Sequence, residues 1–186
     1  MCTTGSCTEV RRVFATRAMF DVNAILGGRQ VDSLCQEAGR NVDENAAWLA
    51  WFAGGEVSPP SERFERFTGP YVTVQGTTIA DGWTSLVSTD FSGRTLSSTI
   101  DVDERGQPIR GATVQGQEIP PIAWTGVEQD GTDAYDNCGD WTFTSTGRFV
   151  GTFGYLSATD ARWTRGGTQD CTEAAHLYCF EQSAQP

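Results

Sequence analysis

Six cysteines in a chain with a single histidine constrain this sequence more than any other feature. None of the cysteines forms a Cys-x-x-Cys pair, and one imidazole is too few for the mixed Cys and His ligand sets of structural zinc sites. An even number of cysteines without metal-binding spacing indicates disulfides, which persist in oxidising compartments. We therefore expect a domain located outside the cytoplasm, with bridges drawn from Cys2, Cys7, Cys35, Cys138, Cys171 and Cys179.

The charge of the chain limits the partners that it can bind. All 13 basic residues are arginine, and 24 acidic residues give a formal net charge of -11. Because like charges repel within a Debye length of about 8 Å at physiological salt, nucleic acid, other polyanions and anionic membrane surfaces are disfavoured. The absence of lysine also excludes Schiff-base chemistry and a phosphate-binding P-loop. Solubility of an exported protein is the simplest reason for the acidity.

A length of 186 residues fits one domain, which would bury about 70% of the surface of its unfolded chain. We expect residues 10–183 to form this domain, between an N-terminal linker remnant at 1–9 and a tail at 184–186. No apolar run is long enough for a membrane helix, and residues 1–5 lack the features of a signal peptide. Any export signal is therefore expected to lie outside this sequence.

The first two cysteines allow two interpretations. Cys2 and Cys7 could close a local bridge in a remnant of a cysteine-rich linker. Alternatively, Cys2 is the lipidated first residue of a mature lipoprotein, which would leave Cys7 unpaired. We favour the bridge.

Hydrophobic periodicity predicts an early strand followed by a helix. Residues 10–16 alternate as a half-buried strand does. After a glycine pair at 27 and 28, apolar residues across 31–38 recur on one helical face. This helix would point Cys35 inward.

A second helix is predicted from Asp43 to Phe52. Asp43 is a favourable N-cap, an acidic residue follows it in the first turn, and glycines at 54 and 55 end the pattern. Trp48, Trp51 and Phe52 would form an aromatic stripe on one side of this helix. We expect this stripe to be core rather than a stacking platform for sugar.

The remainder of the chain predicts short strands and long loops. Strands are expected at 71–74, 78–80 and 122–124, and a final strand around 177–182. The stretch 82–121 is rich in Ser, Thr, Gly and Asp, so we expect an ordered loop with short strands there.

An acidic loop, Glu128–Asn137 with Asp140 beyond it, contains the clearest candidate site. Calcium prefers six to eight oxygen ligands. The side chains that could supply several of these oxygens are Asp130, Asp133, Asp136, Asn137 and Asp140. The spacing does not fit an EF-hand loop, and Asp and Asn also make ordinary turns. We favour turns over a calcium site, and we expect no other cofactor.

Catalysis is not indicated by the sequence. The only histidine, His176, lies on the expected final strand close to Cys179, where a partner nucleophile is not evident. Neither Gly-x-Ser-x-Gly nor His-Glu-x-x-His occurs. Paired carboxylates for glycoside hydrolysis depend on tertiary geometry, so a hydrolase stays open as a minor alternative to a non-enzyme.

Short motifs rich in tryptophan, glycine and cysteine recur from Val13 to Gln182. They are Leu26-Gly27-Gly28 with Asp32 to Cys35, Trp48-Leu49-Ala50-Trp51 with Ser58-Pro59, Arg63-Phe64 with Phe67-Thr68-Gly69-Pro70-Tyr71-Val72, Ile79-Ala80-Asp81-Gly82-Trp83, Trp124-Thr125-Gly126, Asn137-Cys138 with Trp141-Thr142, Trp163-Thr164, and Leu177-Tyr178-Cys179-Phe180-Glu181-Gln182. Together they resemble a bacterial extracellular family of unknown function, first catalogued in leptospiral proteins and grouped with the C-type-lectin-like folds.

The last third of the chain is also similar to the collagen-derived endostatin domain. It has a Trp-x-Gly strand at 124–126, a loop with an Asp-Gly pair, a Cys-x-x-Trp strand at 138–141, and two cysteines eight residues apart, Cys171 and Cys179.

Both resemblances imply an α+β fold of the C-type-lectin-like, endostatin-like type. Two helices would flank a twisted antiparallel sheet whose first and last strands are adjacent. The same resemblances imply two nested disulfides, one from Cys35 to Cys179 and one from Cys138 to Cys171.

The chain departs from the better-known relatives of that fold. Calcium-dependent lectins carry a Glu-Pro-Asn or Gln-Pro-Asp tripeptide and a Trp-Asn-Asp tripeptide, whereas this chain has Trp163-Thr164-Arg165 near the second position and no match to the first. We expect the shared calcium and sugar site to be absent. Endostatin's heparin affinity depends on a basic face, which the net charge here does not favour.

These expectations lead to two functional hypotheses. The first is an extracellular or cell-surface binding or adhesion module that recognises a glycan or a protein through exposed loops, with candidate contacts at Tyr135, Tyr155, Trp163 and Arg165. The second is a structural or oligomerising domain of a surface fibre or lipoprotein with no small ligand. Fold resemblance alone does not choose between them.

Overall fold

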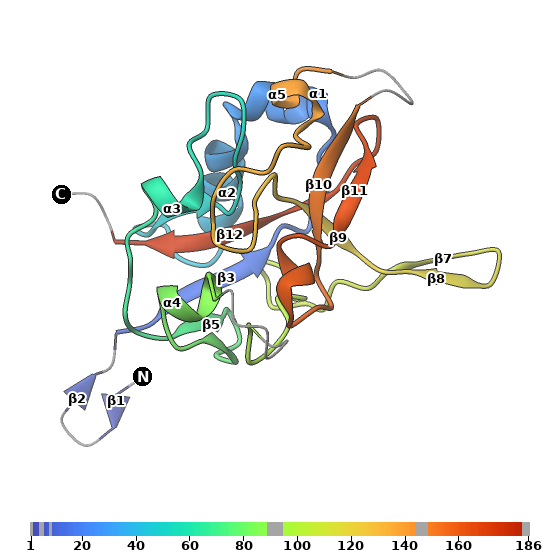
Figure 1. The fold of residues 1–186 in the computed structure, drawn as a ribbon. Helices are drawn as coiled ribbons and strands as arrows, with labels where there is room; N and C mark the ends of the chain where they lie inside the picture. The colour runs from blue at the N-terminus through green and yellow to red at the C-terminus, as the bar shows by residue number, and fades with distance from the viewer. Residues whose placement is uncertain (1, 4–5, 8, 89–94, 144–148, 184–186) are drawn as a thin grey trace.

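The computed structural model describes residues 2–3, 6–7, 9–88, 95–143 and 149–183. It has a mixed α+β fold with short helices around a large twisted sheet (Figure 1). The α-helices are α1 (Val22–Ile25), α2 (Val31–Gly39), α3 (Pro60–Arg63), α4 (Trp83–Leu86) and α5 (Cys138–Trp141). The strands are β1 (Cys2–Thr3), β2 (Ser6–Cys7), β3 (Arg11–Ala15), β4 (Ala47–Ala50), β5 (Tyr71–Thr73), β6 (Thr78–Ala80), β7 (Ala112–Val114), β8 (Gln117–Ile119), β9 (Ile122–Trp124), β10 (Val150–Tyr155), β11 (Gly167–Asp170) and β12 (His176–Gln182).

Eight strands form the main sheet, in the order β11-β10-β9-β12-β3-β5-β6, and β4 also pairs with β12. The expected adjacency of the first and last strands is confirmed, because β3 lies antiparallel to β12 with Phe14 opposite Cys179. The expected antiparallel sheet is only partly right. β12 runs parallel to β9, and β3 runs parallel to β5, so the sheet is mixed.

Strand β12 has more strand neighbours than its length of seven residues would suggest. One edge pairs with β3 along Tyr178–Phe180. The other edge pairs with β9 at His176 and Leu177 and then with β4 along Cys179–Gln182. This strand therefore joins three parts of the chain that are far apart in sequence.

The side chains of β12 also connect the two faces of the sheet, because successive residues of a strand point to opposite sides. Leu177 and Cys179 belong to one buried apolar cluster, whereas Tyr178 and Phe180 belong to the other. All four are at most 1% exposed. A strand covered on both faces reads as a continuous apolar run, which is what the sequence shows here.

The predicted second helix is wrong, because residues 47–50 form strand β4. Its burial alternates, with Trp48 and Ala50 buried and Leu49 half-buried. An apolar run of this length fits either a buried helix or a buried strand, and here pairing with β12 decides for the strand. The aromatic residues are core as expected, since Trp48 is 1% exposed and Trp51 and Phe52 are fully buried.

Two polar side chains of α2, four residues apart, cover the outer edge of β4. The Gln36 side chain accepts a hydrogen bond from the Trp48 amide at 3.0 Å and donates to the Ala46 carbonyl at 2.9 Å. The Asp32 carboxylate accepts from the Ala50 amide at 2.8 Å. Because an unpaired strand edge leaves backbone groups without partners, these contacts replace a neighbouring strand.

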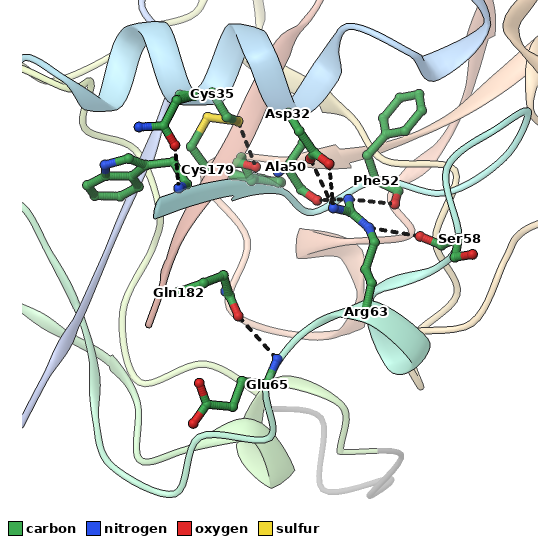
Figure 2. A network of polar contacts seen from close by, with 12 residues as sticks. Asp32, Cys35, Ala50, Phe52, Ser58, Arg63, Glu65, Cys179 and Gln182 are labelled. Atoms are coloured by element: carbon green, nitrogen blue, oxygen red, sulfur yellow. Dashed lines mark hydrogen bonds and ion pairs between the residues drawn. A yellow bond between two sulfur atoms is a disulfide. The ribbon is translucent and has the colours of Figure 1, made fainter. Parts of the chain in front are cut away.

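Arg63, at the end of α3, completes this edge (Figure 2). Its Nη1 donates to both carboxylate oxygens of Asp32 at 2.9 Å. Its Nη2 donates to the carbonyls of Ala50 and Phe52, and its Nε donates to the Ser58 carbonyl at 2.8 Å. The planar guanidinium thus bridges helix α2, the end of β4 and the turn before α3.

The two disulfides that the resemblance implied are both present. Cys35 of α2 is bonded to Cys179 of β12, with 5.4 Å between the Cα atoms. Cys138 of α5 is bonded to Cys171, which follows β11, with 5.8 Å between the Cα atoms. The first bridge holds helix α2 against the sheet, as Figure 2 shows, and the inward direction predicted for Cys35 is confirmed.

The strand expected at 138–141 is wrong, because these residues form the short turn α5. The remaining expected elements agree with the structure in kind and position. The strand predicted at 10–16 is β3, the helix at 31–38 is α2, and the strands at 71–74, 78–80 and 122–124 are β5, β6 and β9. The loop expected at 82–121 contains α4 and a hairpin of β7 and β8.

The N-terminal residues form a separate small hairpin in which Cys2 lies opposite Cys7 in the backbone pairing of β1 and β2. The side chains of these residues, and the tail at 184–186, lie outside the part of the chain that the structure describes. The choice between a Cys2–Cys7 bridge and a lipidated Cys2 stays a prediction.

Among the described residues, no helix combines the length and the apolar character that crossing a bilayer requires.

Removing the two disulfides is expected to lower stability to different extents. The Cys35–Cys179 bridge spans 144 residues and the Cys138–Cys171 bridge spans 33. In the chain-entropy model, the double variant Cys35→Ala/Cys179→Ala therefore loses about 5 kcal/mol of unfolding free energy, and Cys138→Ala/Cys171→Ala about 4 kcal/mol. Urea titration followed by tryptophan fluorescence would measure both, and a larger loss for the short bridge would contradict this ranking.

Replacing Arg63 with methionine should destabilise the domain by about 2–3 kcal/mol, because the carbonyls at the end of β4 lose their donors. The matched control is Arg40→Met, whose arginine is exposed and has no side-chain partner among the described residues. Thermal unfolding of both variants would test this. Equal melting temperatures for the two would show that the Arg63 contacts contribute nothing.

Candidate functional site

Large apolar side chains that remain on the surface gather at two places. Among the described residues they are Met19, Ile119, Tyr135, Phe143 and Val150. Tyr135 and Val150 line one concavity, beside which Phe143 stacks on the lining residue Phe149. Met19 and Ile119 line another concavity. Clustered apolar surface indicates binding sites more often than scattered apolar residues do, so we describe both places.

The first concavity, here called the acidic groove, has a volume of about 700 Å³. The connection from β9 to β10 forms most of it. Its lining consists of Asp133, Ala134, Tyr135, Asp136, Asn137, Gly139, Asp140, Phe149 and Val150. Three carboxylates, one amide and an exposed phenol therefore line the groove together with the apolar side chains of Phe149 and Val150.

Backbone hydrogen bonds hold the groove segment against the sheet. The Thr152 amide donates to the Asp136 carbonyl at 2.7 Å, and the Ala134 amide donates to the Gly126 carbonyl at 2.7 Å. The Ala134 side chain is 2% exposed, whereas Tyr135 is 96% exposed. Tyr135 is thus presented to solvent on an anchored backbone, which lowers the ordering cost of binding.

The turn α5, at the side of the groove, has a left-handed backbone. Its φ angles are 54° at Cys138, 58° at Gly139, 56° at Asp140 and 56° at Trp141. This conformation costs about 1–2 kcal/mol for each residue that carries a Cβ. Such strain persists only where the surrounding structure enforces it, and it concentrates at functional sites.

Three contacts enforce the left-handed turn. The Cys138–Cys171 disulfide fixes its first residue. The Trp141 indole is fully buried and donates from Nε1 to the Ala53 carbonyl at 2.8 Å. The Asn137 side chain accepts a hydrogen bond from the Asp140 amide at 3.0 Å. Asp140 is therefore held in the groove by a rigid backbone.

The groove has a negative potential. Burial raises the pKa of Asp133 above its ordinary value, and the nearby charge of Asp140 raises it further. Two carboxylates that repel each other in this way attract a cationic group or a hydroxyl donor. The acidic groove is thus suited to basic or polyhydroxylated ligands and disfavours anions.

The residues considered as calcium ligands take part in local turns. Asp130 accepts hydrogen bonds from the Thr132 amide at 3.0 Å and the Thr132 hydroxyl at 2.6 Å, which lowers the pKa of Asp130. Asn137 and Asp140 bond to each other, while Asp133 and Asp136 line the groove. In the described part of the chain, no three His, Cys, Asp or Glu side chains form a group that could hold a metal ion.

The candidate ligand contacts fall in different environments. Trp163 is 1% exposed and packs in the core against Trp51 and Tyr178, so its expected role as a surface contact does not fit the structure. Arg165 is a surface residue that pairs with Glu128 at 2.9 Å. Only Tyr135 lies in the acidic groove, and Tyr155 lies in the second concavity.

This second concavity, here called the hairpin pocket, has a volume of about 350 Å³. It lies between the base of the β7–β8 hairpin and the strands β9 to β12. Its walls are mainly apolar, and its polar side chains are Arg110, Gln169, Glu173 and His176. No motif in the sequence points to this place, and Gln115-Gly116 is not one of the dipeptides, such as Asn-Gly or Asp-Gly, that mark a hairpin turn strongly.

His176 is buried in the wall of the hairpin pocket and is 7% exposed. Its Nδ1 lies 2.6 Å from the Thr16 carbonyl oxygen. Because a carbonyl only accepts, Nδ1 carries the hydrogen atom and Nε2 is the acceptor of the neutral ring. Burial lowers the pKa of His176, although the carbonyls of Thr16 and Ala18 and the charge of Glu104 act in the opposite direction.

No protein-family model and no curated protein matches the sequence of this chain.

The lowered pKa of His176 predicts a loss of stability in mild acid. Above the unfolded-state pKa of about 6.5, His176 is neutral in both the folded and the unfolded protein. As the pH falls below this value, His176 of the unfolded chain binds a proton, whereas His176 of the folded chain stays neutral, so the unfolded state is favoured. The loss is at most about 1.4 kcal/mol per pH unit and ends once the pH is below the folded-state pKa. Unfolding free energies measured between about pH 7.5 and 5.5 would reveal it.

The control variant is His176→Asn, which retains a donor toward the Thr16 carbonyl but does not titrate. Because the chain has one histidine, this variant should show a flatter pH dependence over the same range. Parallel curves for the two proteins would contradict the prediction.

Proposed function

We propose that this protein is an extracellular or cell-surface binding module that recognises a glycan or a protein through the acidic groove. It carries out this role without the calcium-dependent sugar site of the better-known lectins. In the same proposal, the α+β fold with its adjacent terminal strands and nested disulfides is of the C-type-lectin-like, endostatin-like type.

One observation carries the proposal: an aromatic side chain that is 96% exposed stands beside carboxylates on a strained backbone that a disulfide and a buried tryptophan hold in place. The Tyr135 side chain is too exposed to stabilise the fold by packing, so stability does not explain why a strained backbone presents it to solvent. Preorganised aromatic and polar groups are what a recognition site needs, because little entropy is lost on binding.

The groove chemistry narrows the ligand class. Carboxylate oxygens accept hydrogen bonds from sugar hydroxyls or from basic side chains, and the Tyr135 ring offers a flat apolar face. The net charge of -11 adds a general preference against anionic ligands. Neutral sugars, amino sugars and basic peptide segments therefore fit best.

Two features support a binding role in an exported protein over catalysis in the cytoplasm. The disulfides at Cys35–Cys179 and Cys138–Cys171 are stable in oxidising compartments. The only histidine is buried in the wall of the hairpin pocket, away from the acidic groove lining, and its Nδ1 is hydrogen-bonded to a backbone carbonyl, so it cannot serve as a general base in the groove.

The second candidate function is a structural or oligomerising domain of a surface fibre or lipoprotein. The observation that favours it is the β7–β8 hairpin, which projects from the body of the molecule (Figure 1). The two functions are compatible, because the hairpin pocket and the acidic groove share no lining residue.

Binding measurements on arrays of neutral glycans, amino sugars and basic peptides would test the main proposal. Tyr135→Ala and Asp140→Asn are each expected to weaken binding about tenfold or more, because each removes a central contact. Asparagine tolerates the left-handed backbone, so the second variant removes charge with little strain. Binding should persist in a chelator, since the groove supplies its own polar groups.

The matched control is Glu37→Gln, which removes an exposed carboxylate from α2, outside the groove lining. It should bind as the unaltered protein does. Uniformly absent binding across the arrays, or equal affinity for Tyr135→Ala and the unaltered protein, would exclude the groove as the recognition site.

A further inference from the structure

The β7–β8 hairpin is an exposed arm. Its two-residue turn, Gln115-Gly116, has φ angles of 49° and 81°, the left-handed pair that a type I′ hairpin turn requires. The side chains of Ala112, Thr113 and of all three β8 residues are exposed. Because an isolated two-stranded hairpin is only marginally stable in water, this arm would gain stability from a surface to pack against.

The hairpin pocket at the base of the arm exposes apolar side chains to solvent. Met19 is 53% exposed and Ile119 is 48% exposed, and both line the pocket with the aromatic residues Phe153 and Tyr155. The adjacent strand β11 is the last strand of the sheet, so one of its edges has no strand neighbour among the residues that the structure describes. An apolar pocket, an exposed arm and a free strand edge therefore adjoin one another.

The hairpin pocket is lined by one positive and one negative side chain. Arg110 and Glu173 are the charged side chains of its lining, and both are exposed. Neither makes a side-chain hydrogen bond or ion pair within the described part of the chain. The lining is therefore neutral overall, on a molecule whose net charge is -11.

We propose that the hairpin pocket and the β7–β8 arm form a self-association surface whose partner is a second copy of this chain. In a two-fold arrangement each contact occurs twice, with residue i of one copy on residue j of the other. Arg110 of each copy faces Glu173 of the other, and the exposed Met19 and Ile119 side chains are covered between them.

The charges of the hairpin pocket are complementary to those of the same pocket on a second copy. Two molecules that each carry a charge of -11 repel one another over most of their surfaces. Here an unpaired cation and an unpaired anion line the same pocket, and a two-fold axis places each opposite its counterpart. The surface is separate from the acidic groove, so this inference stands whether or not the groove binds a glycan or a protein.

Sedimentation velocity from about 1 to 200 µM would test the proposal, with a dimer whose dissociation constant falls within that range as the expected result. Arg110→Glu and Glu173→Arg should each weaken the dimer about tenfold or more, because each creates two like-charge contacts. An equimolar mixture of the two variants should restore the dimer, since every 110–173 contact then joins opposite charges.

The matched controls are Arg105→Glu and Glu37→Arg, which make the same charge changes at exposed positions outside the pocket lining. They should leave the dissociation constant unchanged. A chain that stays monomeric throughout the range would overturn the proposal. A dimer that is insensitive to Arg110→Glu and Glu173→Arg, or variants that do not associate on mixing, would overturn it as well.

Discussion

The pairing of strand β12 is the constraint on which the rest of the structure depends. Its two edges join β3, β9 and β4, and its side chains alternate between the two apolar clusters. Cys179, at its middle, is bonded to helix α2, which in turn covers the outer edge of β4 through Asp32 and Gln36. One seven-residue strand therefore fixes the order of the sheet, the position of its main helix and the partition of the core.

The rigidity of this arrangement is transmitted to the surface at the acidic groove. Thr152 of β10 holds the groove segment by its backbone, and the buried Trp141 and the Cys138–Cys171 disulfide hold the left-handed turn. Stability from the core thus offsets local strain at the place where Tyr135 is presented. The β7–β8 arm is different, because its exposed side chains give it no such support.

The parts of this structure that follow local rules could be predicted, and the parts that depend on distant contacts could not. Helical spacing identified α2. Residues 47–50 carry an apolar run that suits a helix or a strand equally, and pairing with the distant strand β12 decides for the strand, with Asp32 and Gln36 covering its other edge. Resemblance, rather than spacing, supplied the disulfide pairing. In the left-handed turn at 138–141, Gly139 and Asp140 are residue types that adopt this backbone, but nothing local marks Cys138 and Trp141. Trp163 is 1% exposed because it packs against Trp51 and Tyr178, which are distant in sequence, so its burial could not be predicted from neighbouring residues.

Native-state hydrogen exchange would test the central role of β12 most directly. The amides of Tyr178–Phe180 should exchange only through global unfolding, with protection free energies equal to the unfolding free energy, because their strand has neighbours on both edges. The amides of β7 and β8 should exchange much faster. If the β12 amides instead exchanged through a partial opening while other strands stayed protected, β12 could not be the strand that holds this fold together.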